Sequence, residues 1–367
     1  MQTVQASAFV ASVYALVVMG IRIVTHETFT ADEVTQLAAC LCLTVGIYLA
    51  EERGTGMEGY NVMKVLLMGL MFLWTKRVQV EGPSESKPIE LQGKTVLITG
   101  GNSGIGLETA KQLWSRGAMV IVASRNVELA QKVFELEISS GRLAVMQLDL
   151  ESFAGVRDFA QRFTSRYNQG LDIFIHNAGS LTLKRRVTTD GFESMMQTNC
   201  LSPFLLLLLL LPVLKRSNTR VVVVSSSSCK LFNQGFNLQA DINSVGDFNM
   251  FYTYAKSKFA LNQLCFELAN KIRRDQVTIN LVHPGCVSTD IVRDMHWVFR
   301  HGQHLLFLFL KSIKQGSRTQ VFVATNPLVA GQSGKYYEHC QAQPVTQLAS
   351  AGEFFVWAEN AVGTKYS

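Results

Sequence analysis

Charged residues are scarce in this sequence of 367 residues: Asp, Glu, Lys and Arg make up 17% of it, while hydrophobic residues make up 48%. Soluble domains have about a quarter of their residues charged, and disordered chains have few hydrophobic residues. The formal net charge is only +6, and no block of like charge occurs. The composition therefore excludes disorder, gives no indication of nucleic-acid binding and favours a globular protein attached to a membrane.

Cysteine and histidine patterns typical of metal or redox sites are absent. The seven cysteines include no Cys-x-x-Cys pair, and the histidines form no His-Glu-x-x-His motif. We therefore expect reduced thiols in a cytosol-facing protein and no metal site.

Long hydrophobic runs are confined to the N-terminal part. They cover Ala8 to Val24, Val34 to Ala50 and Val62 to Trp74. The first two reach the lower limit for a spanning helix, which needs about 17–25 residues; the third is shorter and contains Lys64, so it either spans or lies at the interface. No basic residue precedes the first run, which argues against a cleaved signal peptide. We expect residues 1–80 to form a helical membrane-anchoring segment of two or three helices.

Charge after the third run predicts the orientation. Lys76 and Arg77 lie on the side of the main domain, which the positive-inside rule places in the cytosol. Residues 81–93, with Pro83 and Pro88, are predicted to be a linker. The main domain is predicted to span residues 94–345, and residues 346–367 a C-terminal tail.

From Lys94 onward, short apolar runs alternate with amphipathic segments, which predicts an α/β fold with a doubly wound parallel sheet, the Rossmann fold. The run Leu205 to Leu211, between Pro203 and Pro212, is too short to span a membrane and is predicted to be a helix buried between the sheet and a subunit partner. The predicted strands are Val96–Ile98, Met119–Val122, Leu143–Gln147, Ile173–Ile175, Val221–Val224 and Thr278–Val282, and the predicted helices are Ile105–Ser115, Asn126–Ile138, Ser152–Tyr167, Gly191–Leu214 and Tyr254–Arg274.

A glycine-rich turn follows the first predicted strand and opens a helix. A glycine at 100 permits a tight turn, one at 104 lets the backbone approach a pyrophosphate, and one at 106 lets helix and strand pack closely. The helix N-terminus adds free N–H groups and a favourable dipole. The predicted dinucleotide-binding residues of this turn are Gly100, Asn102, Ser103, Gly104, Ile105 and Gly106.

The second predicted strand runs into Ser124 and Arg125 without an acidic residue. An acidic residue here is typical of NAD sites, where it binds the ribose 2′-hydroxyl, whereas an arginine can pair with a 2′-phosphate. The sequence therefore favours NADP(H) over NAD(H), with Arg125 as the phosphate ligand.

An ordered series of motifs resembles the short-chain dehydrogenase/reductase family over about Lys94 to Cys340. The sequence departs from the family at His176 and Val223, where an asparagine is common, and at Ser202-Pro203. The motifs are Thr99-Gly100-Gly101-Asn102-Ser103-Gly104-Ile105-Gly106, Leu148-Asp149-Leu150, Asn177-Ala178-Gly179, Thr198-Asn199, Val224-Ser225-Ser226, Tyr254-Ala255-Lys256-Ser257-Lys258 and His283-Pro284-Gly285.

The resemblance implies a catalytic tetrad. Tyr254 is the expected proton donor and acceptor, and Lys258, on the same helical face, is expected to lower the phenol pKa and hold the nicotinamide ribose. Ser226 is expected to bind the substrate oxygen, and Asn199 to anchor a relay water.

Two registers remain open at this point. Tyr252 and Lys256 share the Tyr-x-x-x-Lys spacing, although Ser257-Lys258 and the residues after it favour the later pair. The catalytic serine lies within Ser225 to Ser228, and alignment on the valine run selects Ser226.

Further cofactor contacts are implied by the resemblance. Asp149 is expected at the adenine. The expected contacts of the adenosine ribose are Asn177, Ala178 and Gly179, and those of the nicotinamide are Pro284, Gly285, Val287 and Thr289.

The C-terminal part resembles the retinol dehydrogenase-like branch, through Gln315-Gly316, Thr319, Val323-Ala324 and Gly334 to Tyr337. The apolar stretch Ile291 to Lys314 is either an ordinary core or dimer helix or a hydrophobic mouth for substrate.

We expect a membrane-bound protein of the endoplasmic reticulum with its catalytic domain facing the cytosol. We expect an NADP(H)-dependent oxidoreductase that interconverts a lipophilic aldehyde or ketone with its alcohol, reduction favoured, the substrate resembling a retinoid, steroid or polyisoprenoid. The resemblance also implies a homodimer through the Leu205 and Tyr254 helices. The alternatives are an NAD-dependent lipid-alcohol dehydrogenase and a nucleotide-sensing membrane scaffold without turnover.

Overall fold

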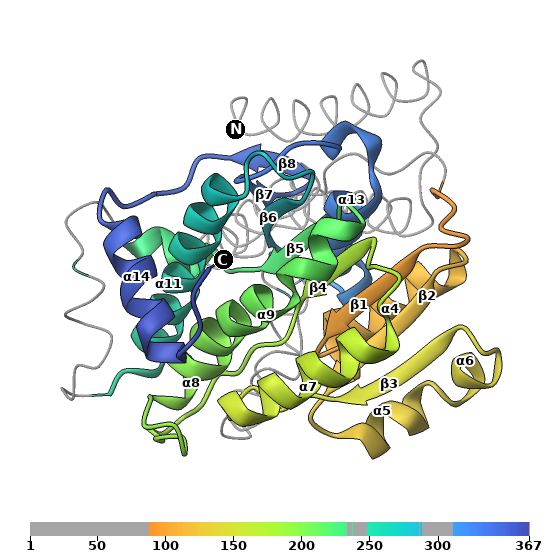
Figure 1. Ribbon diagram of the computed structural model, residues 1–367, viewed down its shortest axis with the longest axis horizontal. Coiled ribbons are helices and arrows are strands. Elements are labelled where there is room, and N and C mark those ends of the chain that lie inside the picture. Colours follow the sequence, from red (N-terminus) through yellow and green to blue (C-terminus); the bar gives the residue numbers. More distant parts are fainter. Residues whose placement is uncertain (1–87, 233–236, 238–247, 286, 288–310, 367) are drawn as a thin grey trace, which may run out of the picture. The chain divides into compact units, whose positions relative to one another are not determined.

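The computed structural model describes residues 88–232, 237, 248–285, 287 and 311–366, which belong to the compact unit Trp74–Ser367 (Figure 1). The predicted anchor helices of residues 1–80, Thr289 and most of the predicted mouth lie outside the described residues.

Strands and helices alternate along the described chain as the sequence predicts. The strands are β1 (Thr95–Thr99), β2 (Met119–Ser124), β3 (Leu143–Gln147), β4 (Ile173–His176), β5 (Arg220–Val224), β6 (Thr278–His283), β7 (Tyr336–Glu338) and β8 (Gln341–Gln343). The α-helices are α4 (Gly104–Ser115), α5 (Val127–Val133), α6 (Glu135–Ser139), α7 (Phe153–Arg166), α8 (Ser194–Met196), α9 (Ser202–Arg216), α11 (Met250–Lys271), α13 (Ile313–Thr325) and α14 (Ala351–Val362). A π-turn, η1 (Gln197–Leu201), joins α8 to α9, and 3₁₀ turns form η2 (Ser227–Leu231) and η4 (Pro327–Val329).

The strands form one sheet in the order β3-β2-β1-β4-β5-β6-β7-β8. All neighbours pair in parallel except β7 and β8, which pair antiparallel. This order confirms the doubly wound sheet. The chain reverses its direction of winding between β1 and β4, and ligands bind such sheets in the crevice at the carboxyl ends of the strands there.

Both faces of the sheet are buried, because successive side chains of each strand point to opposite sides. One face packs α7, α9 and α11 around Leu97, Phe174 and neighbouring strand residues. The other packs α4 and α13 against Ile98 and Val122 (Figure 1). The near-continuous apolar strands in the sequence reflect this double burial.

The leucine-rich run lies in α9 and is buried by the chain itself. Ser194–Arg216 is the one described helical stretch long and apolar enough to cross a membrane, and 89% of its most apolar window is buried. The segment predicted as a tail supplies part of the cover: the Phe355 ring of α14 meets the Phe204 ring of α9 edge-on, 5.0 Å between centroids. The prediction of a buried helix is confirmed, and the subunit partner stays a prediction.

The helix expected over Asn126–Ile138 is two helices. It ends after Val133, Phe134 is buried with non-helical backbone angles, and α6 begins at Glu135. The break lets Phe134 reach the core on the α4 side of the sheet.

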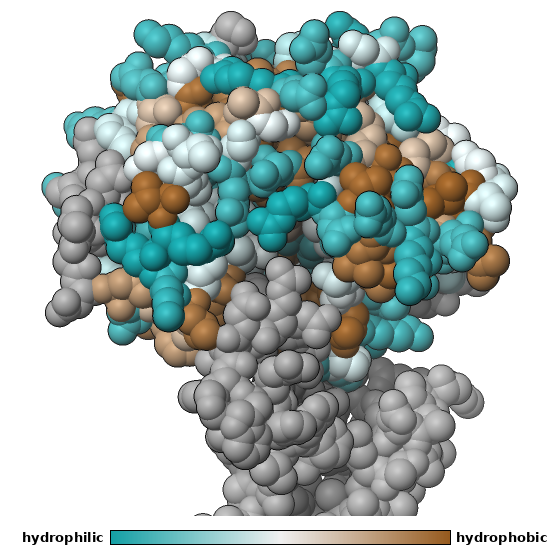
Figure 2. Space-filling model, turned by 90° about the horizontal axis from the view of Figure 1, so that it is seen from below, coloured by the Kyte–Doolittle hydropathy of each residue, from teal (hydrophilic) through white to brown (hydrophobic). Residues whose placement is uncertain are grey.

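The surface of the described part is mixed. On the face in Figure 2, hydrophilic residues separate the hydrophobic patches, so the described part of this face has no continuous apolar band.

Candidate active site

The glycine-rich turn between β1 and α4 has the tight geometry that its glycines predict. Gly100 and Gly104 adopt φ of +65° and +53°, a region that favours glycine. A Cβ at Gly106 would lie 2.2 Å from the Gly100 carbonyl oxygen and 2.3 Å from Asn177 Nδ2. The turn therefore packs against the end of β4 with no room for a side chain at position 106.

The N-terminus of α4 offers its N–H groups to a ligand. Its N-cap, Ser103, makes no side-chain cap hydrogen bond, and the first turn has no acidic residue. The first N–H groups of a helix have no partner within it, and anions bind there. The uncapped terminus and the glycine cradle together fit the pyrophosphate of a dinucleotide.

The end of β4 is tied to this turn through side chains. Asn177 Nδ2 donates to the Gly100 carbonyl oxygen at 3.0 Å, and the Ala178 N–H donates to Thr99 Oγ1 at 3.1 Å. The unusual His176 keeps the connection, since its Nδ1 lies 3.0 Å from the same Oγ1. Burial, helped by the nearby Lys258 charge, lowers the pKa of His176 to about 3, so the ring is neutral.

Tyr254 and Ser226 meet at the carboxyl end of β5. Ser226 follows the strand, caps η2 by accepting from the Ser228 N–H, and forms a side-chain hydrogen bond with Tyr254 of α11. The preceding Ser225 points into the core, where its Oγ donates to Asn262 Oδ1 at 2.7 Å. Of the two residues that open the serine run, Ser226 is thus the one beside the phenol.

The expected lowering of the Tyr254 pKa is not found. Burial raises the pKa of Tyr254 to about 12, and the hydrogen bond with Ser226 offsets only part of this rise. The Lys258 ammonium is directed elsewhere: it donates to the Val224 carbonyl oxygen at 2.9 Å and lies 6.0 Å from the phenol ring centre. The phenol is therefore protonated at neutral pH.

Lys258 is fully buried behind the site. Burial lowers its pKa to about 8, because desolvation disfavours the ammonium. A Cβ at Gly179 would lie 3.2 Å from its Nζ, so the glycine leaves room for the lysine beside the predicted ribose site.

The alternative pair, Tyr252 and Lys256, lies outside this cluster. Tyr252 is exposed and packs edge-on against Phe232, with 5.4 Å between centroids. Lys256 Nζ lies 5.8 Å from the Tyr252 ring centre. The geometry favours Tyr254 and Lys258, whose catalytic roles stay predictions.

Asn199 occupies the middle of the π-turn η1 and is buried. Its Oδ1 accepts from the Ser180 N–H at 2.7 Å, and its Nδ2 donates to the Ser180 carbonyl oxygen and to Ser257 Oγ. The side chain thus joins the loop after β4 to α11. π-turns are common at functional sites, and the anchoring of a relay water by Asn199 stays a prediction.

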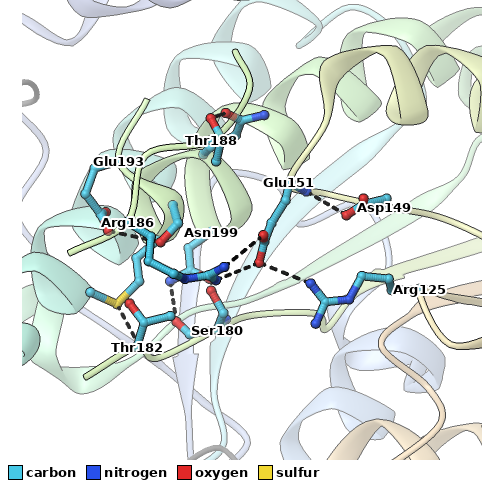
Figure 3. A network of polar contacts seen from close by, with 12 residues as sticks. Arg125, Asp149, Glu151, Ser180, Thr182, Arg186, Thr188, Glu193 and Asn199 are labelled. Carbon is cyan, nitrogen blue, oxygen red and sulfur yellow. Dashed lines mark hydrogen bonds and ion pairs between the residues drawn. The ribbon is translucent and has the colours of Figure 1, made fainter. Parts of the chain in front are cut away.

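At the predicted adenosine end, Arg125 and Asp149 follow β2 and β3. Arg125 Nη1 donates to Glu151 Oε1 at 3.1 Å, and Asp149 Oδ1 accepts from the Glu151 N–H at 3.0 Å. Arg186, from the loop after β4, donates to the same carboxylate (Figure 3). Sequence reasoning missed Glu151 and Arg186, because only the path of that loop brings Arg186 to the end of β3.

At the predicted nicotinamide end, Pro284 and Gly285 follow β6, and Val287 forms an isolated parallel bridge with Lys311. Gly285 has φ of +92°, and a Cβ there would lie 2.8 Å from the Lys311 side chain. The structure thus brings the predicted cofactor residues, Thr289 apart, to the carboxyl edge of one sheet, in the order of their strands.

Comparison with known proteins agrees with this arrangement. A family model described as short chain dehydrogenase matches residues 94–239 and 241–296. Retinol dehydrogenase 14 of Mus musculus is 35% identical over 299 residues, 76% of this chain and 89% of the relative. Retinol dehydrogenase 12 of Homo sapiens is 36% identical over 271 residues, which cover 71% of this chain and 82% of the relative. Polyprenol dehydrogenase of Mus musculus is 35% identical over 277 residues, 73% and 82%.

Solved structures share the fold. An uncharacterized protein from Mycobacterium paratuberculosis aligns with a TM-score of 0.60 and 28% identity, covering 78% of this chain and 99% of its own. A short chain dehydrogenase from Burkholderia cenocepacia, solved in complex with NADP, aligns with a TM-score of 0.54 and 24% identity, covering 72% and 99%; at that identity the likeness concerns the fold alone.

Proposed function

The chain belongs to the short chain dehydrogenase family, and on that premise we propose that it is a membrane-anchored, NADP(H)-dependent oxidoreductase that interconverts a lipophilic aldehyde or ketone with its alcohol, reduction favoured. Membership makes it an oxidoreductase that acts on CH–OH groups with a nicotinamide cofactor. The direction, the phosphate on the cofactor and the substrate class are the proposed part.

The observation that carries the proposal is the Tyr254–Ser226 pair at the end of β5, backed by Lys258. When bound, the nicotinamide supplies the hydride, so the protein has to supply position and a proton. The Tyr254 hydroxyl donates that proton to the carbonyl oxygen, and Ser226 donates a hydrogen bond to the same oxygen. The buried Lys258 ammonium, which donates to the Val224 carbonyl oxygen in the free protein, would have to turn towards the phenol to stabilise the phenolate that remains.

Tyr254 carries its proton at neutral pH, which is the form that reduction of a carbonyl needs. A general acid must carry its proton before the reaction, and this phenol does so throughout the neutral range. Oxidation needs the phenolate instead, which burial disfavours until a positive charge offsets it.

The proposed substrate is a hydrophobic alcohol or carbonyl compound. The relatives are named for retinol and polyprenol, two alcohols with long apolar chains. The proposed location is the endoplasmic reticulum membrane, with the catalytic domain in the cytosol. The apolar runs within residues 1–80 support the attachment to a membrane. A homodimer through α9 and α11 remains part of the proposal. Fractionation with protease protection, and molecular mass in mild detergent, check these points.

NAD(H) dependence is the second candidate, and one contact favours it. Glu151 neutralises Arg125 in part, at 3.1 Å, and a carboxylate near the ribose repels a 2′-phosphate. Since no acidic residue directly follows β2 to bind the 2′-hydroxyl, NADP(H) stays the preferred cofactor.

The test uses the full chain purified in detergent. Binding of NADPH and NADH is followed by fluorescence titration, and NADPH oxidation is followed with retinal, a polyprenal and a steroid ketone. We expect tighter binding of NADPH and turnover with at least one of these carbonyls. Binding without turnover on any of them would refute the proposed substrate class, and failure to bind either cofactor would refute the whole proposal.

A further inference from the structure

Two arginines from distant parts of the chain converge on one carboxylate (Figure 3). Arg125 Nη1 and Arg186 Nη2 lie 3.1 and 3.0 Å from the same oxygen, Oε1 of Glu151, and Arg186 Nη1 lies 3.4 Å from its Oε2. The two donor nitrogens on Oε1 are therefore at most about 6 Å apart, which is close enough for one phosphate group to accept from both guanidinium groups.

This triad lies where the fold places the adenosine ribose. Arg125 directly follows β2, and Glu151 is held two residues beyond Asp149, which accepts its N–H. Both strands end at the carboxyl edge of the sheet, next to the glycine turn. The arginine side chains are 58% and 53% exposed and the Glu151 side chain 24%, so the cations face solvent while the carboxylate lies beneath them.

The triad by itself carries a net positive charge. Two guanidinium groups and one carboxylate leave one positive charge, and a phosphate monoester carries about −1.5 to −2 at neutral pH. With Glu151 in place, the phosphate gains two cationic partners but also meets one repelling anion. The carboxylate therefore limits the selectivity that two arginines alone would produce.

We propose, on the basis of the proposed NADP(H) function, that Arg186 is a second ligand of the 2′-phosphate beside Arg125, and that Glu151 is an internal competitor that sets the strength of the NADP(H) preference. Glu151 binds both guanidinium groups in the free protein, so the phosphate has to compete with this carboxylate for them. Arg186 gives the loop after β4 a part in cofactor selection.

The test compares ligands that differ by the 2′-phosphate alone. Affinities of the full chain in detergent are measured for NADPH against NADH, and for adenosine 2′,5′-bisphosphate against adenosine 5′-monophosphate, so that catalysis plays no part. Arg186→Ala is compared with Arg185→Ala, its sequence neighbour, as the matched control. Arg186→Ala should lower the affinity for the two ligands with a 2′-phosphate about tenfold, as expected for losing one charge-assisted hydrogen bond. Its affinities for NADH and adenosine 5′-monophosphate should change less than about twofold. Arg185→Ala should change none of the four affinities.

Glu151→Gln should change the affinity for ligands with a 2′-phosphate in the opposite direction. This variant should bind NADPH and adenosine 2′,5′-bisphosphate several-fold more tightly than the wild type, and its affinities for the other two ligands should be unchanged. The double variant Glu151→Gln with Arg186→Ala should lose this gain.

The outcomes separate this inference from the proposed function. A wild-type protein that prefers NADPH, and an Arg186→Ala variant that keeps the full preference, would overturn the role of Arg186 and leave the function standing. If the wild type shows no preference, the NADP(H) assignment fails. The competitor role then stands if Glu151→Gln creates a preference that Arg186→Ala removes, and falls if it does not. If Arg186→Ala lowers the affinity for all four ligands equally, Arg186 has a structural role and the inference is also overturned.

Discussion

Replacing Gly106 by alanine isolates the contribution of close packing at the glycine turn. Alanine within a helix is favoured over glycine by about 0.5–1 kcal/mol. At Gly106 the added Cβ meets the Gly100 carbonyl oxygen at 2.2 Å and Asn177 Nδ2 at 2.3 Å. Neither atom is free to move, since one is backbone and the other is hydrogen-bonded to that same carbonyl at 3.0 Å.

Gly352, in the first turn of α14, is the matched control. A Cβ there would have Glu267 Oε1 as its nearest neighbour, at 3.9 Å. Gly352→Ala therefore keeps the helical gain of about 0.5–1 kcal/mol. Overpacking costs about 1–3 kcal/mol, and the immobile neighbours of Gly106 place Gly106→Ala at the upper end. The two variants should differ by about 3 kcal/mol in free energy of unfolding, or about 6–12 °C in Tm.

Thermal unfolding of both variants and titration with NADPH form the assay. Gly106→Ala should also bind NADPH at least about tenfold more weakly, because the turn that presents the α4 N–H groups has to shift. Gly352→Ala should bind like the wild type. The packing argument is refuted if Gly106→Ala is as stable as Gly352→Ala and binds NADPH unchanged.

Two further predictions concern single side chains. Tyr254→Phe should abolish turnover while NADPH binding persists, whereas Tyr252→Phe should keep most of the activity; a fully active Tyr254→Phe enzyme would contradict the assignment, and carbonyl-dependent NADPH oxidation is the measurement. His176 has a pKa of about 3 in the folded chain, against an ordinary 6.5, so between these values the unfolded state binds more protons and stability falls as the pH falls below about 6.5. In urea unfolding, the free energy of unfolding of the wild type should fall by about 2 kcal/mol more than that of His176→Asn between pH 7 and pH 5. Equal decreases would show that His176 is not buried as a neutral ring.

Many local features could be predicted from the sequence because they depend on neighbours along the chain. The alternation of apolar runs specifies strands buried on both faces, and the glycines at 100 and 104 correspond to positive φ angles in the turn. The break at Phe134 was missed, since the 126–138 segment has a continuous amphipathic pattern and only packing against the sheet interrupts it.

In the candidate site, too, some features could be predicted from the sequence and others depend on the tertiary structure. Tyr254 and Lys258 share a helical face through their spacing, but Tyr252 and Lys256 have the same spacing, and the exposure of Tyr252 distinguishes the two pairs only in the structure. Whether the Lys258 ammonium faces the phenol or the Val224 carbonyl oxygen depends on the end of β5, and the rise of the Tyr254 pKa depends on how deeply the cluster is buried.

Only the tertiary structure decided which distant residues share a contact. No spacing rule links Arg125, Glu151 and Arg186, because each follows a different strand and the loop after β4 has no periodic pattern. The same holds for Phe355 of α14 against Phe204 of α9. Periodicity reports which face of an element is buried, whereas the partner of each buried or charged side chain depends on the order of strands in the sheet and the course of the loops between them.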